Sequence, residues 1–168
     1  KEKGILELVK AFSRLHQKHK NTVLWIAGPD EDFLHPKLEK ITGICLIPFV
    51  NFPEKYMTAS DVLCLPSHRE GFGNVIIEAG ACGVPSIGSN IYGLNDAIVD
   101  GETGILIPLK SVSGLENAME LLVNDSKLRH KMGKAAQERS ASIFSQEILT
   151  EQLVDLYKSL LQDHLYKA

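Results

Sequence analysis

The sequence has few cysteines and no long hydrophobic run. It contains three cysteines, an odd number, and their spacing does not match that of a metal site. Cys45, Cys64 and Cys82 each lie in an apolar run, which favours buried, reduced thiols and a cytoplasmic protein. No apolar stretch approaches the roughly 20 residues that a helix needs to cross a bilayer, and no signal peptide is recognisable. We therefore expect these residues to form neither a disulfide-rich secreted domain nor a membrane span.

The sequence also lacks an excess of basic residues. Its 18 lysines and arginines are outnumbered by 21 aspartates and glutamates, so the formal net charge is -3. A chain without net positive charge lacks the usual attraction to the phosphates of a nucleic acid, so we expect no nucleic-acid partner. With 168 residues, of which 44% are hydrophobic and 23% charged, the chain is long enough and apolar enough to bury a core. We expect a folded domain that binds a compact ligand.

The apolar residues predict an alternation of helices and short strands. The predicted strands are residues 22–27, 44–49, 61–65, 85–88 and 104–108. Helical spacing is found at residues 5–15, 34–41, 54–59 and 74–82, and from residue 111 almost to the end, with breaks near 124–126 and 144–145. This rhythm predicts an α/β fold with a Rossmann-like, doubly wound parallel sheet.

Ligands of such sheets bind at the carboxyl ends of the strands. The loops after Ala27, Phe49, Leu65 and Gly88 are therefore expected to face the site. Trp25 lies within the first predicted strand, which is apolar along nearly its whole length and is typical of a strand buried on both faces. We expect this tryptophan in the core.

The most informative segment is HREGFGNVIIEAGACGVP, residues 68–85. Gly71 and Gly73 let the backbone approach a ligand closely, and the helix predicted from Asn74 presents free amides and the positive end of its dipole. The loop is therefore a candidate seat for a phosphate. It matches neither the dinucleotide fingerprint G-x-G-x-x-G nor a P-loop, which ends in Gly-Lys-Ser/Thr.

Two carboxylates flank this loop eight positions apart. If both lay on one helix, Glu70 and Glu78 would be about 12 Å apart along its axis, too far for a paired acid and base acting on one bond. The spacing instead suits an elongated ligand with hydroxyls at both ends of a diphosphate, such as a nucleotide sugar. In the alternative interpretation, Glu78 is a solvated helix residue and Glu70 belongs to a Ser-x-x-Glu cap that begins at Ser67.

These residues together resemble a known family. The pattern P-S-x-x-E-G-F-G-x-x-x-x-E-A-x-A-x-G-x-P at residues 66–85, followed by Gly93 and by D-G-x-T-G at residues 100–104, resembles the retaining, nucleotide-sugar-dependent glycosyltransferases of the group 1 type. The resemblance covers essentially the whole chain. It implies a GT-B fold, built from two Rossmann domains, of which residues 1–168 are the single C-terminal, donor-binding domain.

The resemblance also implies where this domain is incomplete. The chain starts at Lys1 with no initiator methionine and runs directly into a helical pattern, so we expect a piece of a longer protein. The first strand of the domain and an arginine usual in the family would precede Lys1. An N-terminal Rossmann domain would supply the acceptor pocket, and the chain alone is expected to be inactive.

The resemblance assigns roles to individual residues. Glu78 matches the acid that binds the ribose hydroxyls. Glu70 matches the acid near the hydroxyls of the donor sugar and is the candidate catalytic residue. Lys3 matches a lysine that contacts the diphosphate and neutralises charge on the leaving group. The remaining donor-binding positions form the loop and the start of the following helix: Gly71, Phe72, Gly73, Asn74 and Val75.

The base of the nucleotide is expected near Phe49 and Val50. The family commonly has a glycine after this strand, where Val50 and Asn51 stand here.

The implied reaction transfers a hexosyl group from a nucleotide-diphosphate sugar, a UDP- or GDP-sugar, with retention of configuration and without a required cofactor or metal. The acceptor would be a sugar or lipid in polysaccharide or glycolipid synthesis, at the cytoplasmic side of the membrane, with peripheral membrane association of the full-length protein. The alternative is a non-catalytic module that binds a nucleotide or a sugar phosphate.

Two further patterns have more than one interpretation. Asp30 and Asp32 form a D-x-D string that could hold a metal at a diphosphate in a single-domain transferase, or could cap the following helix. The apolar stripe in the last helix could pack at a domain junction or bind a partner helix. This stripe consists of Ile148, Leu149, Leu153, Leu156, Tyr157, Leu160 and Leu161.

Overall fold

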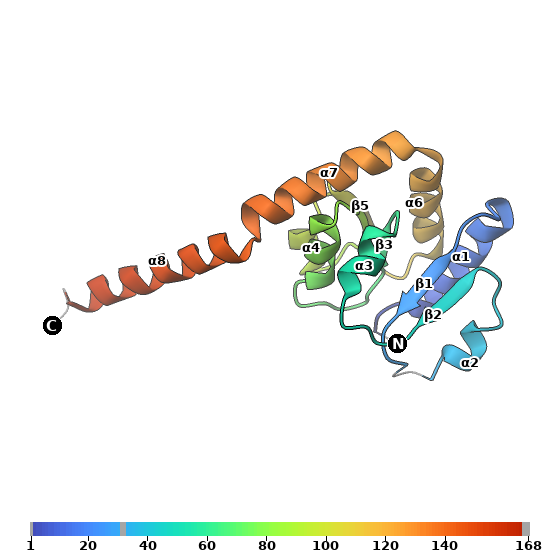
Figure 1. The fold of residues 1–168 in the computed structure, drawn as a ribbon, viewed down its shortest axis with the longest axis horizontal. Coiled ribbons are helices and arrows are strands. Elements are labelled where there is room, and N and C mark those ends of the chain that lie inside the picture. Colours follow the sequence, from blue (N-terminus) through green and yellow to red (C-terminus); the bar gives the residue numbers. More distant parts are fainter. Residues whose placement is uncertain (1, 31–32, 166–168) are drawn as a thin grey trace.

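The computed structural model describes residues 2–30 and 33–165 and contains parallel strands connected by helices (Figure 1). The strands are β1 (Leu24–Ala27), β2 (Ile44–Ile47), β3 (Leu63–Leu65), β4 (Ser86–Ser89) and β5 (Gly104–Ile107). The helices are α1 (Ile5–Lys18), α2 (His35–Leu38), α3 (Pro53–Thr58), α4 (Asn74–Ala81), α5 (Leu94–Ala97), α6 (Val112–Asn124), α7 (Ser126–Ile143) and α8 (Gln146–Leu165). The predicted α/β class is confirmed, as are the two breaks in the C-terminal helical region. The short helix α5 was not predicted.

The strands form two parallel sheets. In one, β1 pairs with β2, with Leu24 opposite Ile44. The other has the order β3-β4-β5, with Leu63 opposite Ser86. Among the described residues, β1 and β3 each have one neighbouring strand, so each has an unpaired edge. Beyond the end of β3, the amide of His68 donates to the carbonyl oxygen of Glu2 at 2.7 Å, which brings the chain that enters α1 alongside β3.

One hydrophobic cluster holds together the two sheets and the helices α1, α6 and α7. Leu8, Phe12 and Leu15 recur at helical spacing along α1 and are at most 4% exposed. They belong to one cluster with buried residues of α6 and β4 and with partly buried residues of both sheets, including Leu24. Burying each large apolar side chain contributes about 1.5–3 kcal/mol, so this cluster positions α1 against the sheets.

The outer face of the β1–β2 pair is not part of this core. Trp25 is 41% exposed, so the expectation that it lies in the core is wrong. Its register partner Cys45 is also exposed, contrary to the expectation of a buried thiol. The reason is the alternation of side chains along a strand, which directs these two residues to a face covered only in part. There Tyr56 of α3 meets the indole edge to face, with ring centroids 6.0 Å apart.

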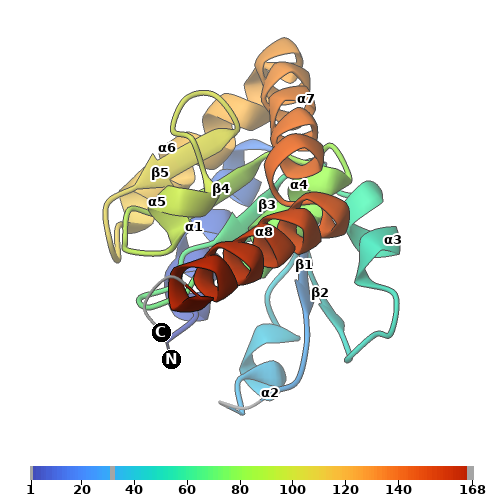
Figure 2. The ribbon, with the colours of Figure 1, turned by 90° about the vertical axis from the view of Figure 1, so that its left-hand side faces the viewer.

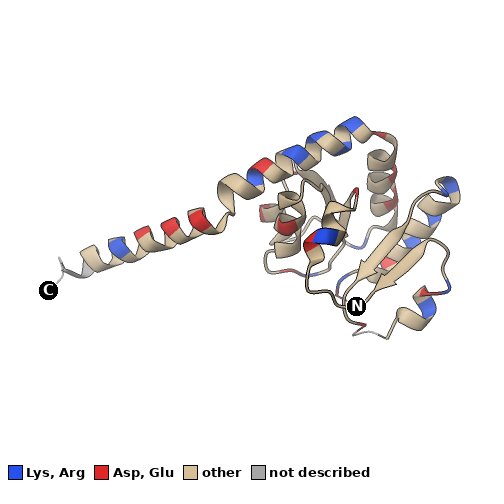
Figure 3. Ribbon diagram, in the orientation of Figure 1, with Lys and Arg blue, Asp and Glu red and all other residues tan. Residues whose placement is uncertain are grey.

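The last helix projects away from the rest of the domain, as Figures 1 and 2 show. Ile148 of the predicted stripe is half-buried. The other residues of the stripe are exposed, from Leu149 at 48% to Leu161 at 66%. Charges of both signs are interspersed along α7 and α8 (Figure 3). Within residues 2–30 and 33–165, no helix is long and apolar enough to cross a membrane.

Candidate functional site

The glycine loop lies between the carboxyl end of β3 and the start of α4, as predicted. Gly73 is the N-cap of α4 and has a φ of 77°, and no side chain caps this helix. The first amides of a helix have no carbonyl one turn earlier to bind. Those of Asn74 and Val75 are therefore available at the end of α4 where the dipole is positive. Gly71 is exposed, and a Cβ built on it meets no atom within 4 Å, so the loop is open on this side.

Glu70 is the centre of a small hydrogen-bond cluster beside this loop. Its Oε1 accepts from Nζ of Lys3 at 2.6 Å and from Oγ of Ser67 at 2.8 Å. The side chain of Glu70 is 13% exposed, whereas that of Lys3 is 61% exposed. The structure thus brings together two of the predicted site residues. An ammonium group has three N–H donors, so Lys3 can contact Glu70 and an anion at once.

The capping interpretation of Ser67 and Glu70 is wrong. The serine hydroxyl donates to the glutamate carboxylate rather than accepting from a helix amide, and α4 begins only at Asn74. The intervening residues, including Gly71 and Gly73, form the loop instead. The pair therefore belongs to the candidate site and does not start the helix.

Close backbone packing sets the position of Lys3. Gly4, the N-cap of α1, has a φ of 67°, and a Cβ on it would lie 2.1 Å from the carbonyl oxygen of Pro66. A side chain would not fit there. This contact places the N-terminus of α1 against the residue that follows β3, next to Ser67. The positive ends of α1 and α4 therefore both face the region around Glu70.

The unpredicted helix α5 supports the glycine loop. Gly93 precedes α5 with a φ of 89°, and a Cβ on it would lie 2.4 Å from the carbonyl oxygen of Gly71. Leu94, the first residue of α5, is fully buried, and a Cβ built on Gly73 would lie 2.5 Å from its Cδ2. Gly93, which belongs to the motif, therefore permits a close approach between two backbone segments.

Three other predicted site residues, Glu78, Phe49 and Val50, lie on other elements than this cluster. Glu78 is exposed on α4, about one turn after its start. Phe49, which is 73% exposed, and the half-buried Val50 follow β2 in the two-stranded sheet, whereas the glycine loop follows β3 in the other sheet. The structure establishes no direct contact between these three residues and Glu70.

Asp30 acts as a helix cap. Its carboxylate accepts from the amides of Leu34 and His35 at 2.7 and 2.9 Å, at the start of α2. Desolvation raises the pKa of Asp30, but the hydrogen bonds from His35 and Leu34 and the nearby imidazole lower it further, so the pKa lies below its ordinary value. The capping interpretation is thus confirmed for Asp30. Asp32, the second residue of the D-x-D string, lies outside the described residues.

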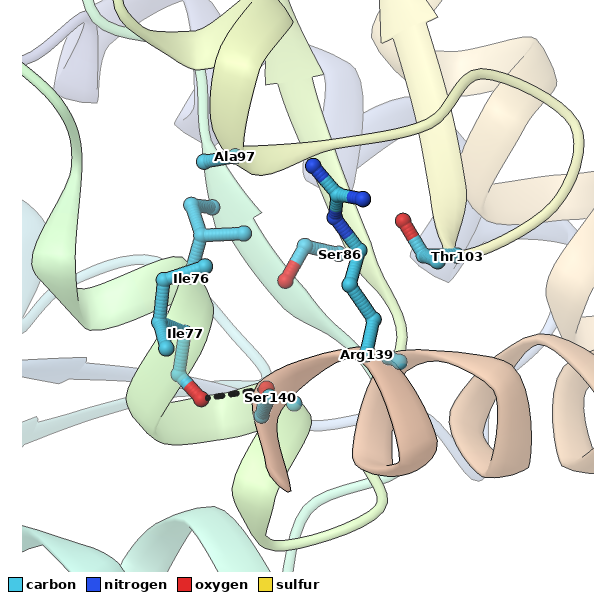
Figure 4. Close-up of a pocket in the computed structure, with 9 residues that line it drawn as sticks. Ile76, Ile77, Ser86, Ala97, Thr103, Arg139 and Ser140 are labelled. Carbon is cyan, nitrogen blue, oxygen red and sulfur yellow. Dashed lines mark hydrogen bonds between the residues drawn. The ribbon is translucent and has the colours of Figure 1, made fainter. Parts of the chain in front are cut away.

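A small cavity lies beside α4, at the amino end of β4 (Figure 4). It includes Ser86, the first residue of β4, and Arg139 of α7. Ser140 closes one side by donating from its hydroxyl to the carbonyl of Ile77 at 3.0 Å. Because the strands are parallel, the amino end of β4 lies away from the loop that follows β3. This cavity is therefore separate from the glycine loop.

Comparisons with known proteins agree with the motif. The family model described as glycosyl transferases group 1 matches residues 1–139. The capsular polysaccharide biosynthesis glycosyltransferase CapM of Staphylococcus aureus is 34% identical over 171 residues, which cover 97% of this chain and 44% of CapM. The chain therefore spans less than half the length of this relative.

Solved structures show the same fold. HepE from Anabaena, in complex with UDP, has a TM-score of 0.86 at 21% identity, covering 94% of this chain and 46% of HepE. The C-terminal domain of the group 1 glycosyl transferase LpcC from Francisella tularensis has a TM-score of 0.77 at 25% identity, covering 86% of this chain and 81% of that one. The predicted Rossmann-like C-terminal half of a GT-B fold is thus confirmed, and the chain belongs to the glycosyl transferases group 1 family.

Proposed function

We propose that residues 1–168 form the donor-binding domain of a retaining hexosyl glycosyltransferase that uses a UDP- or GDP-sugar. The observation that carries this proposal is the cluster of Lys3 and Glu70 beside the glycine loop, at the N-terminus of α4. It combines a cation and free amides, which suit a diphosphate, with a carboxylate, which suits sugar hydroxyls. UDP in the complex of HepE, a protein of the same fold, supports a nucleotide as the ligand.

Each group has a role in this proposal. Glu78 accepts hydrogen bonds from the ribose hydroxyls, and Glu70 accepts them from the donor sugar. The diphosphate lies between them, at the amides of the glycine loop. Phe49 and Val50 lie near the base.

The proposed chemistry is the departure of the nucleoside diphosphate from the anomeric carbon. Negative charge develops on the leaving phosphate as this bond breaks, and catalysis requires groups that stabilise that charge where it appears. The ammonium group of Lys3 and the positive end of α4 supply this stabilisation without a metal ion. Asp30 has no part in it, because its carboxylate is occupied by the amides of α2.

The unpaired edges of β1 and β3 support a further strand in the full-length protein. The hydrogen bond from the His68 amide to the Glu2 carbonyl brings the chain just before α1 beside β3. We propose that the residues preceding Lys1 continue along β3 as a parallel strand and join the two sheets. An N-terminal Rossmann domain then provides the acceptor pocket, and this domain alone is inactive.

The proposed acceptor is a sugar or lipid in the synthesis of a polysaccharide or glycolipid. The capsular polysaccharide role in the name of CapM supports this class of product. A cytoplasmic protein that associates peripherally with the inner face of the membrane would have access to both a nucleotide sugar and a lipid-linked acceptor.

Isothermal titration of the full-length gene product tests the proposal. UDP, GDP, ADP and their common sugar conjugates are titrated into the wild type and into the Glu78→Gln and Glu138→Gln variants. Glu138 is exposed on α7, where it pairs with Lys134, and is the matched control. We expect one base to bind, with about tenfold weaker affinity in Glu78→Gln, the cost of a hydrogen bond to a charged group.

An analogue without ribose hydroxyls completes this test. The 2′,3′-dideoxy form of the nucleoside diphosphate that binds should have the same affinity for Glu78→Gln and the wild type. Turnover with a sugar acceptor separates the transferase from a non-catalytic module. Failure of the full-length protein to bind any of the nucleotides at millimolar concentration would refute the proposal.

A further inference from the structure

Ser67 is fully buried and contacts the carboxylate of Glu70. Its Oγ donates to Oε1 of Glu70 at 2.8 Å, and its exposed fraction is 0%. A buried hydroxyl needs a hydrogen-bond partner, and in this structure that partner is the glutamate. The backbone of this segment is held in turn by the contact between Pro66 and Gly4. The serine therefore provides a rigid contact to Glu70.

The two donors to Glu70 differ in how firmly they are held. Lys3 reaches the same oxygen, Oε1, from a long side chain that is 61% exposed. An exposed lysine pays side-chain entropy to keep one geometry and is screened by salt. Ser67 has a single side-chain torsion before its hydroxyl and is enclosed by protein. Of the two donors, Ser67 is therefore the more firmly held.

Both donors contact one oxygen and leave the other for a ligand. Among the described residues, Oε2 of Glu70 accepts no hydrogen bond from the protein. A carboxylate oxygen has two lone pairs and can accept from two hydroxyls. Fixing Oε1 restricts the rotation of the carboxylate and hence the position of Oε2.

We propose that Ser67 is a positioning residue, which orients Glu70 through Oε1 so that Oε2 meets the hydroxyls of the donor sugar. This inference rests on the proposed function and adds to it a residue that does not itself touch the ligand. If Ser67 has this role, it does not affect the affinity for the nucleoside diphosphate. It affects only the additional affinity that the sugar contributes.

The test compares paired ligands in the full-length gene product. UDP and UDP-glucose form one pair, and GDP and GDP-mannose the other; the pair that binds the wild type is used for the variants. In Ser67→Ala we expect about tenfold weaker binding of the nucleotide sugar, equivalent to the loss of one hydrogen bond to a charged group. The affinity for the nucleoside diphosphate should change by less than about twofold.

A matched control and a second variant separate positioning from folding. Ser140→Ala removes another buried serine hydrogen bond, from α7 to the carbonyl of Ile77 in α4, and should leave the affinity ratio of the two ligands unchanged. Ser67→Cys nearly keeps the side-chain volume and has only a weak donor, so it should reproduce the Ser67→Ala effect even if alanine lowers the yield of folded protein. In a Glu70→Ala background, Ser67→Ala should have no further effect on the ratio.

The outcomes distinguish this inference from the proposed function. A selective loss of the sugar contribution in both Ser67 variants supports it. Equal changes for the diphosphate and the sugar conjugate, or no change for either, overturn it while leaving the donor-binding proposal intact. If the wild type binds neither pair, the proposed function fails, and the positioning role fails with it.

Discussion

The ring of Phe72 packs against the ring of Phe144, with centroids 5.4 Å apart and planes inclined by 59°. Phe72 lies in the glycine loop, and Phe144 is the C-cap of α7, two residues before the start of α8. Arg139 lies over the Phe144 ring and also donates to the carbonyl of Asp96 at 2.9 Å. The loop that we assign to the donor is therefore in contact with the junction of the two C-terminal helices.

Alanine substitutions of Phe72 and Phe144, singly and together, measure this contact. We expect the two changes to be coupled by about 0.5–1.5 kcal/mol, the usual energy of an aromatic pair beyond area burial, in a double-mutant cycle of chemical unfolding. Phe33→Ala is the control, because Phe33 is 84% exposed. Additive effects of the two substitutions would show that the rings contribute independently.

Lys3→Met tests the role of the lysine at the diphosphate. Removing the cation should weaken the binding of UDP or GDP by about tenfold at low salt, since charge-assisted hydrogen bonds to phosphate are lost. Binding of the corresponding nucleoside, which has no phosphate, should be unchanged. The salt dependence of diphosphate affinity should also become smaller, as measured by calorimetry at several ionic strengths.

Lys10→Met is the control for this substitution, because Lys10 is exposed on α1. If Lys3 serves only its exposed ion pair with Glu70, an interaction worth about 0–1 kcal/mol, the diphosphate affinities of the two variants will be equal.

Gly93→Ala should displace the glycine loop. The added Cβ would lie 2.4 Å from the carbonyl oxygen of Gly71, and the φ of 89° is unfavourable for alanine. Gly101→Ala is a matched control, since Gly101 also has a positive φ, 75°, but open space around its Cβ position. We expect about 1–2 kcal/mol of destabilisation from backbone strain in the control and more at position 93, by chemical unfolding.

The same pair of glycine variants reports on the site. Nucleotide affinity should fall in Gly93→Ala and stay at the wild-type value in Gly101→Ala. Equal losses of stability and affinity at the two positions would contradict a supporting role for Gly93 under the loop.

The stability that the Asp30 cap gives to α2 should depend on pH in a predictable direction. The pKa of Asp30 is lowered in the folded state, so its stabilising effect is complete above its unfolded pKa of about 3.9. The effect is lost as the pH falls through the lower, folded value. Hydrogen exchange of the Leu34 and His35 amides should therefore accelerate, relative to other helix amides, in this acidic range.

Asp30→Ala should remove this acid transition by exposing the same amides at neutral pH. It should also leave nucleotide binding insensitive to added Mg²⁺ or Mn²⁺, as in the wild type. A metal-dependent affinity that disappears in Asp30→Ala would favour the D-x-D interpretation instead.

The local features of the fold could be read from residue patterns. The spacing of Leu8, Phe12 and Leu15 marked α1, and short apolar runs marked each of the strands found among the described residues. Glycine at positions 71 and 73 marked the loop before α4. The helix α5, only four residues long, was missed because so short a segment shows no periodicity.

Burial was less predictable than secondary structure. Trp25 and Cys45 lie in apolar strands, yet both are exposed, because an apolar run does not specify whether both faces of a strand are covered. Coverage depends on the helices and strands that pack beside it, and these come from distant parts of the chain. The same limit applies to the division of the strands into two sheets.

The sequence by itself determined the parallel α/β class, the family and the order of loop and helix at the candidate site, because these depend on local periodicity and a contiguous motif. Only the tertiary structure decided which partners Glu70 has. Lys3 is 67 positions away from it in the chain, and Ser67, which matches a common capping pattern, turns its hydroxyl to the carboxylate instead. These contacts exist because α1 packs its N-terminus against Pro66, and such packing depends on the summed burial of many side chains, which no single motif encodes.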